Sequence, residues 1–158
     1  MDLQPLFQWF EGTSLGTVVR QSLWLFPVIE CVHLLGLALL GGTVLVVDMR
    51  MLGLGLRSHP TAGLARKLHP WMVASLLTLI FTGIPMFLSE AIKCYFSPPF
   101  WYKMGLLILA TTFALTVRRK VALAEPGRVA PALVRLTAVL SLALWFGVGF
   151  AGRWIAFY

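Results

Sequence analysis

Two ionisable side chains, Glu30 and His33, lie inside the first long apolar stretch of the sequence, residues 21–47. Ionisable groups at membrane depth are costly, so they normally face a protein interior, a cofactor or a proton path. The two residues are three positions apart and therefore share one face of a helix. A helix continuous from Arg20 would place His33 roughly 20 Å from that charge, near the middle of a bilayer. This pair is the first candidate functional site.

The residue type of His33 suggests a ligand. Neutral imidazole is the usual protein ligand of haem iron and of many metals, and a helix bundle can hold a macrocycle between its helices. Small residues follow His33, and they would let either a neighbouring helix or a flat cofactor approach the backbone closely: Gly36, Ala38, Gly41 and Gly42. The alternative for His33 is a plain hydrogen bond to a neighbouring helix.

Lys103 is the candidate cation for Glu30, because it lies at the start of the third apolar stretch, in PPFWYKMGLL. A carboxylate and an ammonium that meet in an apolar medium partly neutralise each other. Glu30 could also orient His33 or accept a proton. The alternative for Lys103 is that its side chain extends to the lipid headgroups.

A second ligand for a metal at His33 is constrained by depth. His33 lies about 22 Å from Asp48 along a helix, and His69 only about 5 Å from Arg66. If Asp48 and Arg66 mark the same membrane interface, the two imidazoles differ by more than about 15 Å in depth. Met86 is nearer to His33 in depth. The candidate ligations are therefore His33 with His69, His33 with Met86, or a single axial histidine.

Composition places the chain in a membrane. Of its 158 residues, 59% are hydrophobic and 12% charged, against about 25% charged in soluble domains. Four apolar segments approach or reach the ~17–25 residues of a spanning helix, at about 22–47, 68–88, 101–117 and 133–152. The sequence predicts a single all-α domain over residues 1–158, an integral membrane four-helix bundle. Residues 1–18 are predicted to form a short interfacial helix, because apolar side chains recur there at helical spacing.

The distribution of Lys and Arg predicts the orientation. Nine lie in the connections after the first and third spans, and four lie on the other side. Basic loops stay in the cytoplasm, so both termini are expected in the periplasm and the protein in a bacterial inner membrane. The net charge of +7 then reports topology and anionic headgroups, not nucleic acid. Cys31 and Cys94 are expected at different depths and as free thiols.

Several segments resemble one family. VIECVHLLGLALLGGTVLVVDMRML resembles the first helix of the HemJ-type protoporphyrinogen oxidases, with His33, Gly41–Gly42 and Arg50 at the matching positions. KLHPWMVASLLTLIFTG and PPFWYKMGLLILA are similar to two later helices of that family. CopD-like copper-resistance membrane domains and small uncharacterised four-helix bacterial families share this layout. The resemblance covers about residues 24–120.

The resemblance implies binding of haem b, with His33 and Lys103 both required. The family's last helix begins with Arg-x-x-Asn-Glu, whereas this chain has ALVRLTAVL, with Arg135 but no Asn-Glu pair. Haem binding is therefore implied more strongly than protoporphyrinogen oxidase activity. If the chain is an enzyme, an oxidoreductase of this type is expected.

Three functions remain open on the sequence. The first is a haem b protein that transfers electrons between a quinone or a periplasmic redox protein and another centre. The second is a CopD-like copper-handling protein, since Cu(I) prefers soft ligands; methionines are present, but no MxxM cluster. The third is a subunit of a larger complex or a homo-oligomer, without a cofactor of its own.

Overall fold

The computed structural model describes residues 3–55, 58–125 and 127–157, and these residues form helices and no strands. Four helical segments are long and apolar enough to cross a membrane, which confirms the all-α bundle predicted from the sequence. They are α3 (Leu25–Leu52), α4 (Thr61–Ser89), the continuous run Pro98–Leu123 and α8 (Pro131–Trp154). The third run consists of α6 (Pro98–Phe113), the π-helical turn η1 (Ala114–Arg118) and α7 (Arg119–Leu123).

Prolines and one glycine set the helix ends. Pro98 and Pro131 occupy the first turns of α6 and α8, where the missing N–H costs no hydrogen bond. Gly53 ends α3 with a φ of +83°, a left-handed conformation that other residues adopt at a cost. Its N–H donates to Arg50 O and Leu54 N–H donates to Met49 O, so two carbonyls of the last turn of α3 are satisfied.

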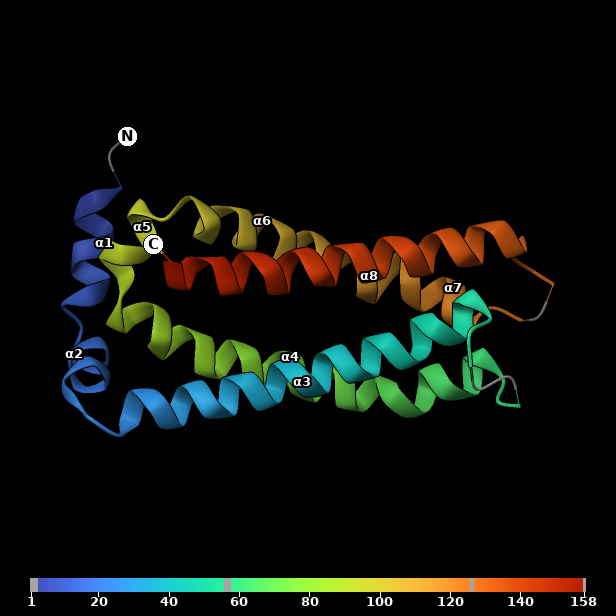
Figure 1. Ribbon diagram of the computed structural model, residues 1–158, viewed down its shortest axis with the longest axis horizontal. Helices are drawn as coiled ribbons and strands as arrows, with labels where there is room; N and C mark the ends of the chain where they lie inside the picture. The colour runs from blue at the N-terminus through green and yellow to red at the C-terminus, as the bar shows by residue number, and fades with distance from the viewer. Residues whose placement is uncertain (1–2, 56–57, 126, 158) are drawn as a thin grey trace.

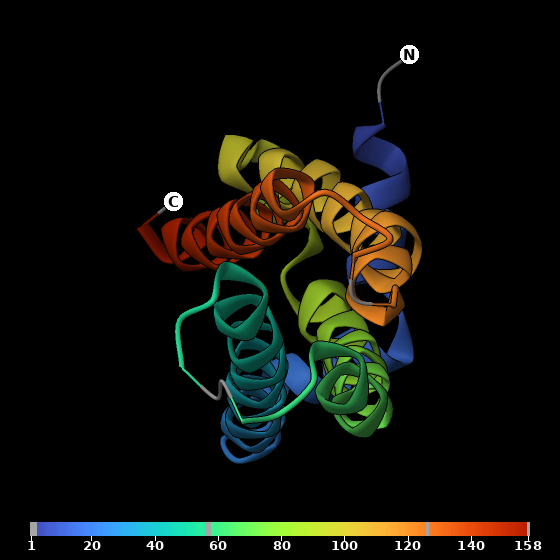
Figure 2. The same ribbon diagram turned by 90° about the vertical axis from the view of Figure 1, so that its right-hand side faces the viewer.

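The four long helices form an elongated bundle (Figure 1). α3 packs along α4, α6 packs along α8, and α3 also contacts α8, as the end-on view shows (Figure 2). Leu40 and Val44 of α3 meet Met72 and Leu76 of α4 in the middle of the bundle. A second apolar cluster, around Val47, joins α3 to α7 and α8. It lies near the end of the bundle that holds the α3–α4 and α7–α8 connections, called the loop end below. A third, around Leu144, joins α6 to α8.

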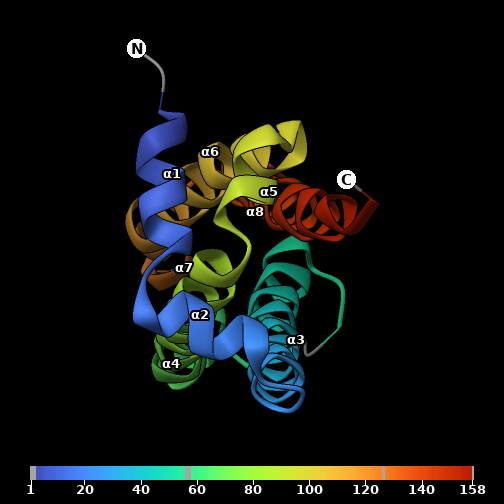
Figure 3. The ribbon, with the colours of Figure 1, turned by 90° about the vertical axis from the view of Figure 1, so that its left-hand side faces the viewer.

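Two short helices, α1 (Gln4–Glu11) and α2 (Ser14–Gln21), cross the end of the bundle opposite the loops (Figure 3). Glu11 holds this end together, because its Oε1 lies 2.6 Å from Arg20 Nη1 and its Oε2 accepts a bond from Ile92 N–H of α5 (Ala91–Phe96). The predicted single N-terminal helix is therefore two helices. Thr13 separates them and caps the second by accepting from Gly16 N–H.

The break between α2 and α3 corrects the depth estimate for His33. Arg20 belongs to α2, and α3 begins at Leu25, so a helix continuous from Arg20 does not exist. His33 lies eight residues into α3, about 12 Å from its start. It remains inside an apolar span, but in the half next to α1 and α2, called the outer half below.

Candidate functional site

His33 is held by α4. Its Nδ1 lies 2.8 Å from Thr82 Oγ1, and Thr82 Oγ1 donates its own proton to Thr78 O at 2.6 Å. A hydroxyl has one proton to donate. With the Thr82 proton donated to Thr78 O, Thr82 Oγ1 accepts from His33, and this arrangement places the proton of the neutral ring on Nδ1. Nε2 then carries a lone pair that can bind a metal or a proton.

Glycines make room for the two polar side chains of this region. A Cβ at Gly83 of α4 would lie 3.5 Å from His33 Cε1, so the ring rests against bare backbone. A Cβ at Gly152 of α8 would lie 3.6 Å from Lys103 Nζ, so the Lys103 side chain extends from α6 across α8. His33 and Lys103 are both partly buried, and we call the part of the outer half that holds these two side chains the outer site.

An apolar core and an aromatic cluster bound the outer site along the bundle axis. The Leu40–Leu76 cluster lies inward of His33 and Thr82 in the order of α3 and α4. Beyond the site, rings from α1, α4, α5 and α6 pack at the bundle end: Phe7, Phe10, Phe87, Tyr95, Phe100 and Trp101. The polar groups therefore lie between two apolar layers, where polar interactions are stronger than in water.

The expected pairing of Glu30 with Lys103 is wrong. Glu30 is exposed on the surface of α3. In the part of the chain that the structure describes, no carboxylate lies within ion-pair distance of Lys103; the ion pairs there join Arg20 to Glu11, Lys93 to Glu90 and Arg118 to Asp48. Lys103 is therefore a largely enclosed cation without an acidic partner among the described residues.

The other predicted ligands separate along α4. Thr82, which bonds His33, is thirteen residues beyond His69, a distance of about 20 Å along the helix. One metal ion cannot bind both imidazoles at that separation. Met86 lies one turn beyond Thr82 on the same face of α4, and it is partly buried. Within the described ranges, no three His, Cys, Asp or Glu side chains converge as a metal cluster.

The predicted small-residue patch has two parts. A Cβ at Gly36 would lie 3.2 Å from Thr78 Cγ2, so this glycine serves the close packing of α3 on α4. Gly41 and Gly42 have nothing within 4 Å of the Cβ position and leave open space. Neither part lines the outer site through a contact with His33.

A second polar site lies in the opposite, inner half of the bundle. Arg118 Nε donates to Asp48 Oδ1 at 2.7 Å, and its Nη2 donates to Val44 O at 3.3 Å. Asp48 is 0% exposed and Arg118 5% exposed. Arg118 ends the π-helical turn, a feature that often occurs at functional sites. Three buried alanines, which lie four or eight residues from Arg118, share its buried face and leave room for the long side chain: Ala110, Ala114 and Ala122.

The Asp48–Arg118 pair has one incomplete edge. Asp48 Oδ2 and Ser141 Oγ are both buried without a hydrogen-bond partner of ordinary geometry among the described residues. Ser141 of α8 nevertheless lies beside the Asp48 carboxylate. The sequence does not predict this site, since the expected spans end at residues 47 and 117 and leave Asp48 and Arg118 outside them. The available signal was an acid inside the apolar run VLVVDMRML.

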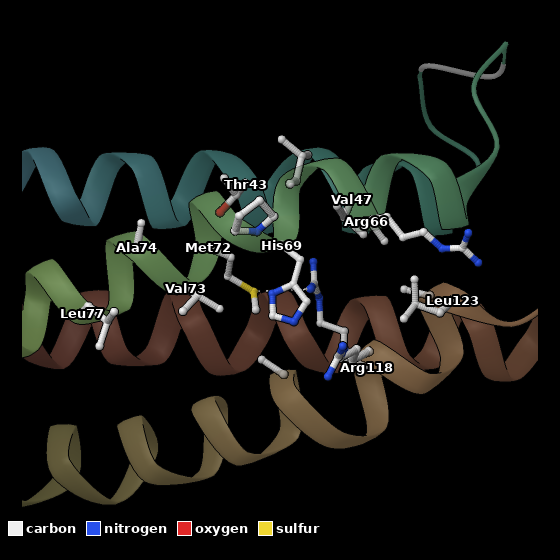
Figure 4. A pocket seen from close by; sticks show the side chains of 16 residues that line it. Thr43, Val47, Arg66, His69, Met72, Val73, Ala74, Leu77, Arg118 and Leu123 are labelled. Atoms are coloured by element: carbon white, nitrogen blue, oxygen red, sulfur yellow. Dashed lines mark hydrogen bonds between the residues drawn. The ribbon is translucent and has the colours of Figure 1, made fainter.

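A cavity of about 580 Å³ adjoins the inner site, between α4 and the η1–α7 segment. Figure 4 shows His69, Met72 and Arg118 at its middle, Arg66 at one end and Leu77 at the other. Arg118 Nη1 contacts Met72 Sδ at 3.9 Å. His69, expected at an interface, thus lines a cavity that the sequence did not reveal.

Both cysteines are free thiols; Cys94 is buried and Cys31 exposed. Cys94 lies in α5, outside the spanning helices. Burial, and after it the negative charge of Glu90, raises the pKa of the Cys94 thiol from 9.0 to about 11. Cys94 also interacts electrostatically with Lys103, which places it beside the outer site.

These features define an all-α membrane bundle with one polar site in each half. The chain belongs to DUF6644, a family of unknown function, whose profile matches residues 6–158. No curated protein and no solved structure matches the chain significantly.

Proposed function

We propose that this chain is a haem b-binding membrane protein that transfers electrons, with His33 as an axial ligand of the iron. The observation that carries the proposal is the hydrogen bond from His33 Nδ1 to Thr82 Oγ1. Histidines that bind metals usually donate their other ring N–H to a fixed acceptor, which sets the tautomer and the ring orientation. In this chain that arrangement lies within a membrane span, where an imidazole without a role is costly.

The side chains of the outer site are of the types that would hold such a group. His33 Nε2 would bind the iron, and Thr82 would keep the ring in position. Lys103, which has no carboxylate partner among the described residues, would pair with a propionate. The aromatic cluster around Phe87 and Phe100 would exclude water from that side. Haem supplies one-electron chemistry, and the protein sets its potential through the axial ligand, burial and hydrogen bonds.

The sixth ligand is proposed to be Met86 or none. His69 is about 20 Å away along α4 and would not share the iron with His33. Met86 shares a helix face with Thr82 and is next to Pro85, an interior proline of α4. A thioether ligand raises the reduction potential relative to a second imidazole.

We further propose a bacterial inner membrane with both termini in the periplasm, on the basis of the basic residues at the loop end of the bundle. Haem at His33 would then lie in the periplasmic half. Its electron donor or acceptor would be a membrane quinone or a periplasmic redox protein. An oxidoreductase activity of the HemJ type is a narrower form of the same proposal, and it rests on the sequence resemblance alone.

One observation favours a different function. Glu30 is exposed on α3, inside a spanning segment, and a carboxylate facing lipid is costly. A partner helix that covers Glu30 would remove that cost, which supports the role of a subunit or a homo-oligomer. Copper handling has weaker support, because Met86 is the only thioether near His33 in the register of α4.

An absorption spectrum of the purified protein, made with ample haem, tests the proposal. The wild-type chain should show the Soret band of a b-type haem, and His33→Ala should lose it while staying in the membrane. His69→Ala is the matched control, since it removes an imidazole from the same bundle and should retain the band. A wild-type protein without a Soret band, or a His33→Ala variant with an unchanged one, would refute haem ligation by His33.

A further inference from the structure

The cavity of about 580 Å³ next to α4 has no role in haem binding at His33. Its size is that of an ordinary small-molecule site. It extends from Arg66 to Leu77, eleven residues of α4, which corresponds to about 16 Å. α4 packs on α7, whereas it makes little contact with α6. The walls of the cavity opposite α4 are formed by η1 and α7 and, at Thr43 and Val47, by α3.

The two ends of the cavity differ in chemistry. Arg66 lines the end near the loops from α4, Arg119 lines the cavity from α7, and both are exposed. Val73, Ala74 and Leu77 line the other end, deeper in the span. Figure 4 shows this order along α4, with Arg66 and Leu77 at opposite ends. Such a cavity is complementary to an elongated molecule with a polar head and an apolar tail.

The charge at the polar end of the cavity determines which headgroup it can bind. Arg118 also lines the cavity, but Asp48 neutralises it at 2.7 Å. Arg66 and Arg119 have no such partner among the described ion pairs, and no Asp or Glu lines the cavity. Guanidinium groups bind phosphate oxygens in a bidentate geometry. His69, at the middle of the cavity, can donate a further hydrogen bond.

We infer that this cavity is a binding site for one anionic phospholipid, with its phosphate at Arg66 and Arg119 and an acyl chain along Val73, Ala74 and Leu77. Basic recesses between spanning helices at the membrane surface are the sites at which anionic lipid headgroups bind. The bound chain fills the space between α4 and the η1–α7 segment and supports the π-helical turn that carries Arg118. The lipid is thus a structural component of the inner half.

The experiment compares phosphatidylglycerol with phosphatidylcholine on delipidated protein in neutral detergent, by native mass spectrometry and thermal unfolding. Phosphatidylglycerol should bind with one-to-one stoichiometry and raise the unfolding temperature more than phosphatidylcholine. Arg66→Gln combined with Arg119→Gln should reduce its affinity about thirtyfold, because each basic residue near the surface contributes on the order of a fivefold effect.

Lys67→Gln combined with Lys120→Gln is the matched control. Each lysine follows one of the two arginines in sequence, is exposed, and does not line the cavity, so this variant removes the same charge without touching the site. It should retain the affinity. Equal losses in both double variants, or equal binding of the two lipids, would overturn the proposal.

Ala74→Phe and inorganic phosphate separate a lipid from a free anion. Ala74 is exposed and lines the apolar end, so a phenyl ring there should block the acyl chain and weaken phosphatidylglycerol binding. Phosphate alone should stabilise the protein little. If phosphate stabilises it as much as the lipid does and Ala74→Phe has no effect, the site binds a free anion and the lipid assignment is wrong.

Discussion

The outer and inner halves of the bundle both hold charged or ionisable side chains in an apolar interior, and they compensate them differently. In the inner half, Arg118 and Asp48 are buried together at 2.7 Å and neutralise each other. In the outer half, the ring of His33 bonds to a neutral hydroxyl. Lys103 lies nearby without a carboxylate partner among the described residues.

This difference indicates that the inner pair holds helices together, whereas the outer side chains are free to bind a ligand. Charges that find their partners within one chain leave little for a ligand to do, because binding would have to break an existing pair. The Lys103 ammonium and the free lone pair of His33 are the opposite case. A group that carries both a carboxylate and a metal ion would pair with the first and bind the second. The comparison therefore favours the outer half over the inner half as the location of the proposed cofactor, and it indicates a helix-packing role for the inner pair.

The largest expected effect follows from removing one member of the inner pair. Arg118→Met leaves Asp48 buried without its cation, which should lower the free energy of unfolding by about 3–5 kcal/mol. The measurement is SDS-induced or thermal unfolding in a neutral detergent. Arg119→Met, an exposed neighbour, should have a small effect. Asp48→Asn combined with Arg118→Met should recover most of the loss, and a double variant no more stable than Arg118→Met would contradict the pairing.

The number of spans was predictable from the sequence because apolar length alone decides it. Their ends were not. The predicted third span stopped at residue 117, since the next residues are Arg118 and Arg119, whereas the helical run continues to Leu123. The ion pair with Asp48 offsets the cost of burying Arg118, so the helix can continue. Because Asp48 is seventy residues away in the sequence, the residues around Arg118 give no indication of this pair.

The candidate site was predictable only in part. His33 and Lys103 stand out because they are ionisable residues in apolar stretches. Thr82 does not, since its role depends on the register of α3 against α4. Glu30 shares a helix face with His33 by spacing, yet its side chain is exposed, because a separation of three residues still allows one of them to point out of the bundle. Pairings of this kind depend on tertiary packing, which periodicity does not encode.

Lys103 provides a sharper test of the comparison. Lys103→Met should stabilise the haem-free protein, because it removes an enclosed cation without an acidic partner, and should increase haem loss roughly ten- to hundredfold, the value of a charged hydrogen bond. Haem transfer to apomyoglobin measures the second effect. Lys93→Met is the control: Lys93 is exposed and 4.0 Å from Glu90, so it should change neither quantity. Equal, negligible effects would show that Lys103 has no part in the site.

Cys94 provides the smallest effect and reports the charge of Lys103 without any cofactor. Its thiol has a pKa of about 11 because of burial first and of Glu90 second, and the positive charge of Lys103 acts in the opposite direction. In a Cys31→Ala background, Cys94 is the remaining thiol. Its reaction with a maleimide should be slow at pH 8 and should accelerate about tenfold per pH unit up to about pH 11, because the thiolate is the reactive form.

The same thiol makes stability depend on pH in a defined direction. The unfolded chain loses the proton near pH 9 while the folded chain keeps it to about pH 11, so stability is complete below pH 9 and falls between these two values. Lys103→Met should slow maleimide labelling at pH 9, since it removes a cation that favours the thiolate, and haem should slow it similarly if a propionate neutralises Lys103. A labelling rate that is the same with and without each change would mean that solvent screens Lys103. Lys103 would then behave as an ordinary surface lysine, and the contrast between the two halves would fail.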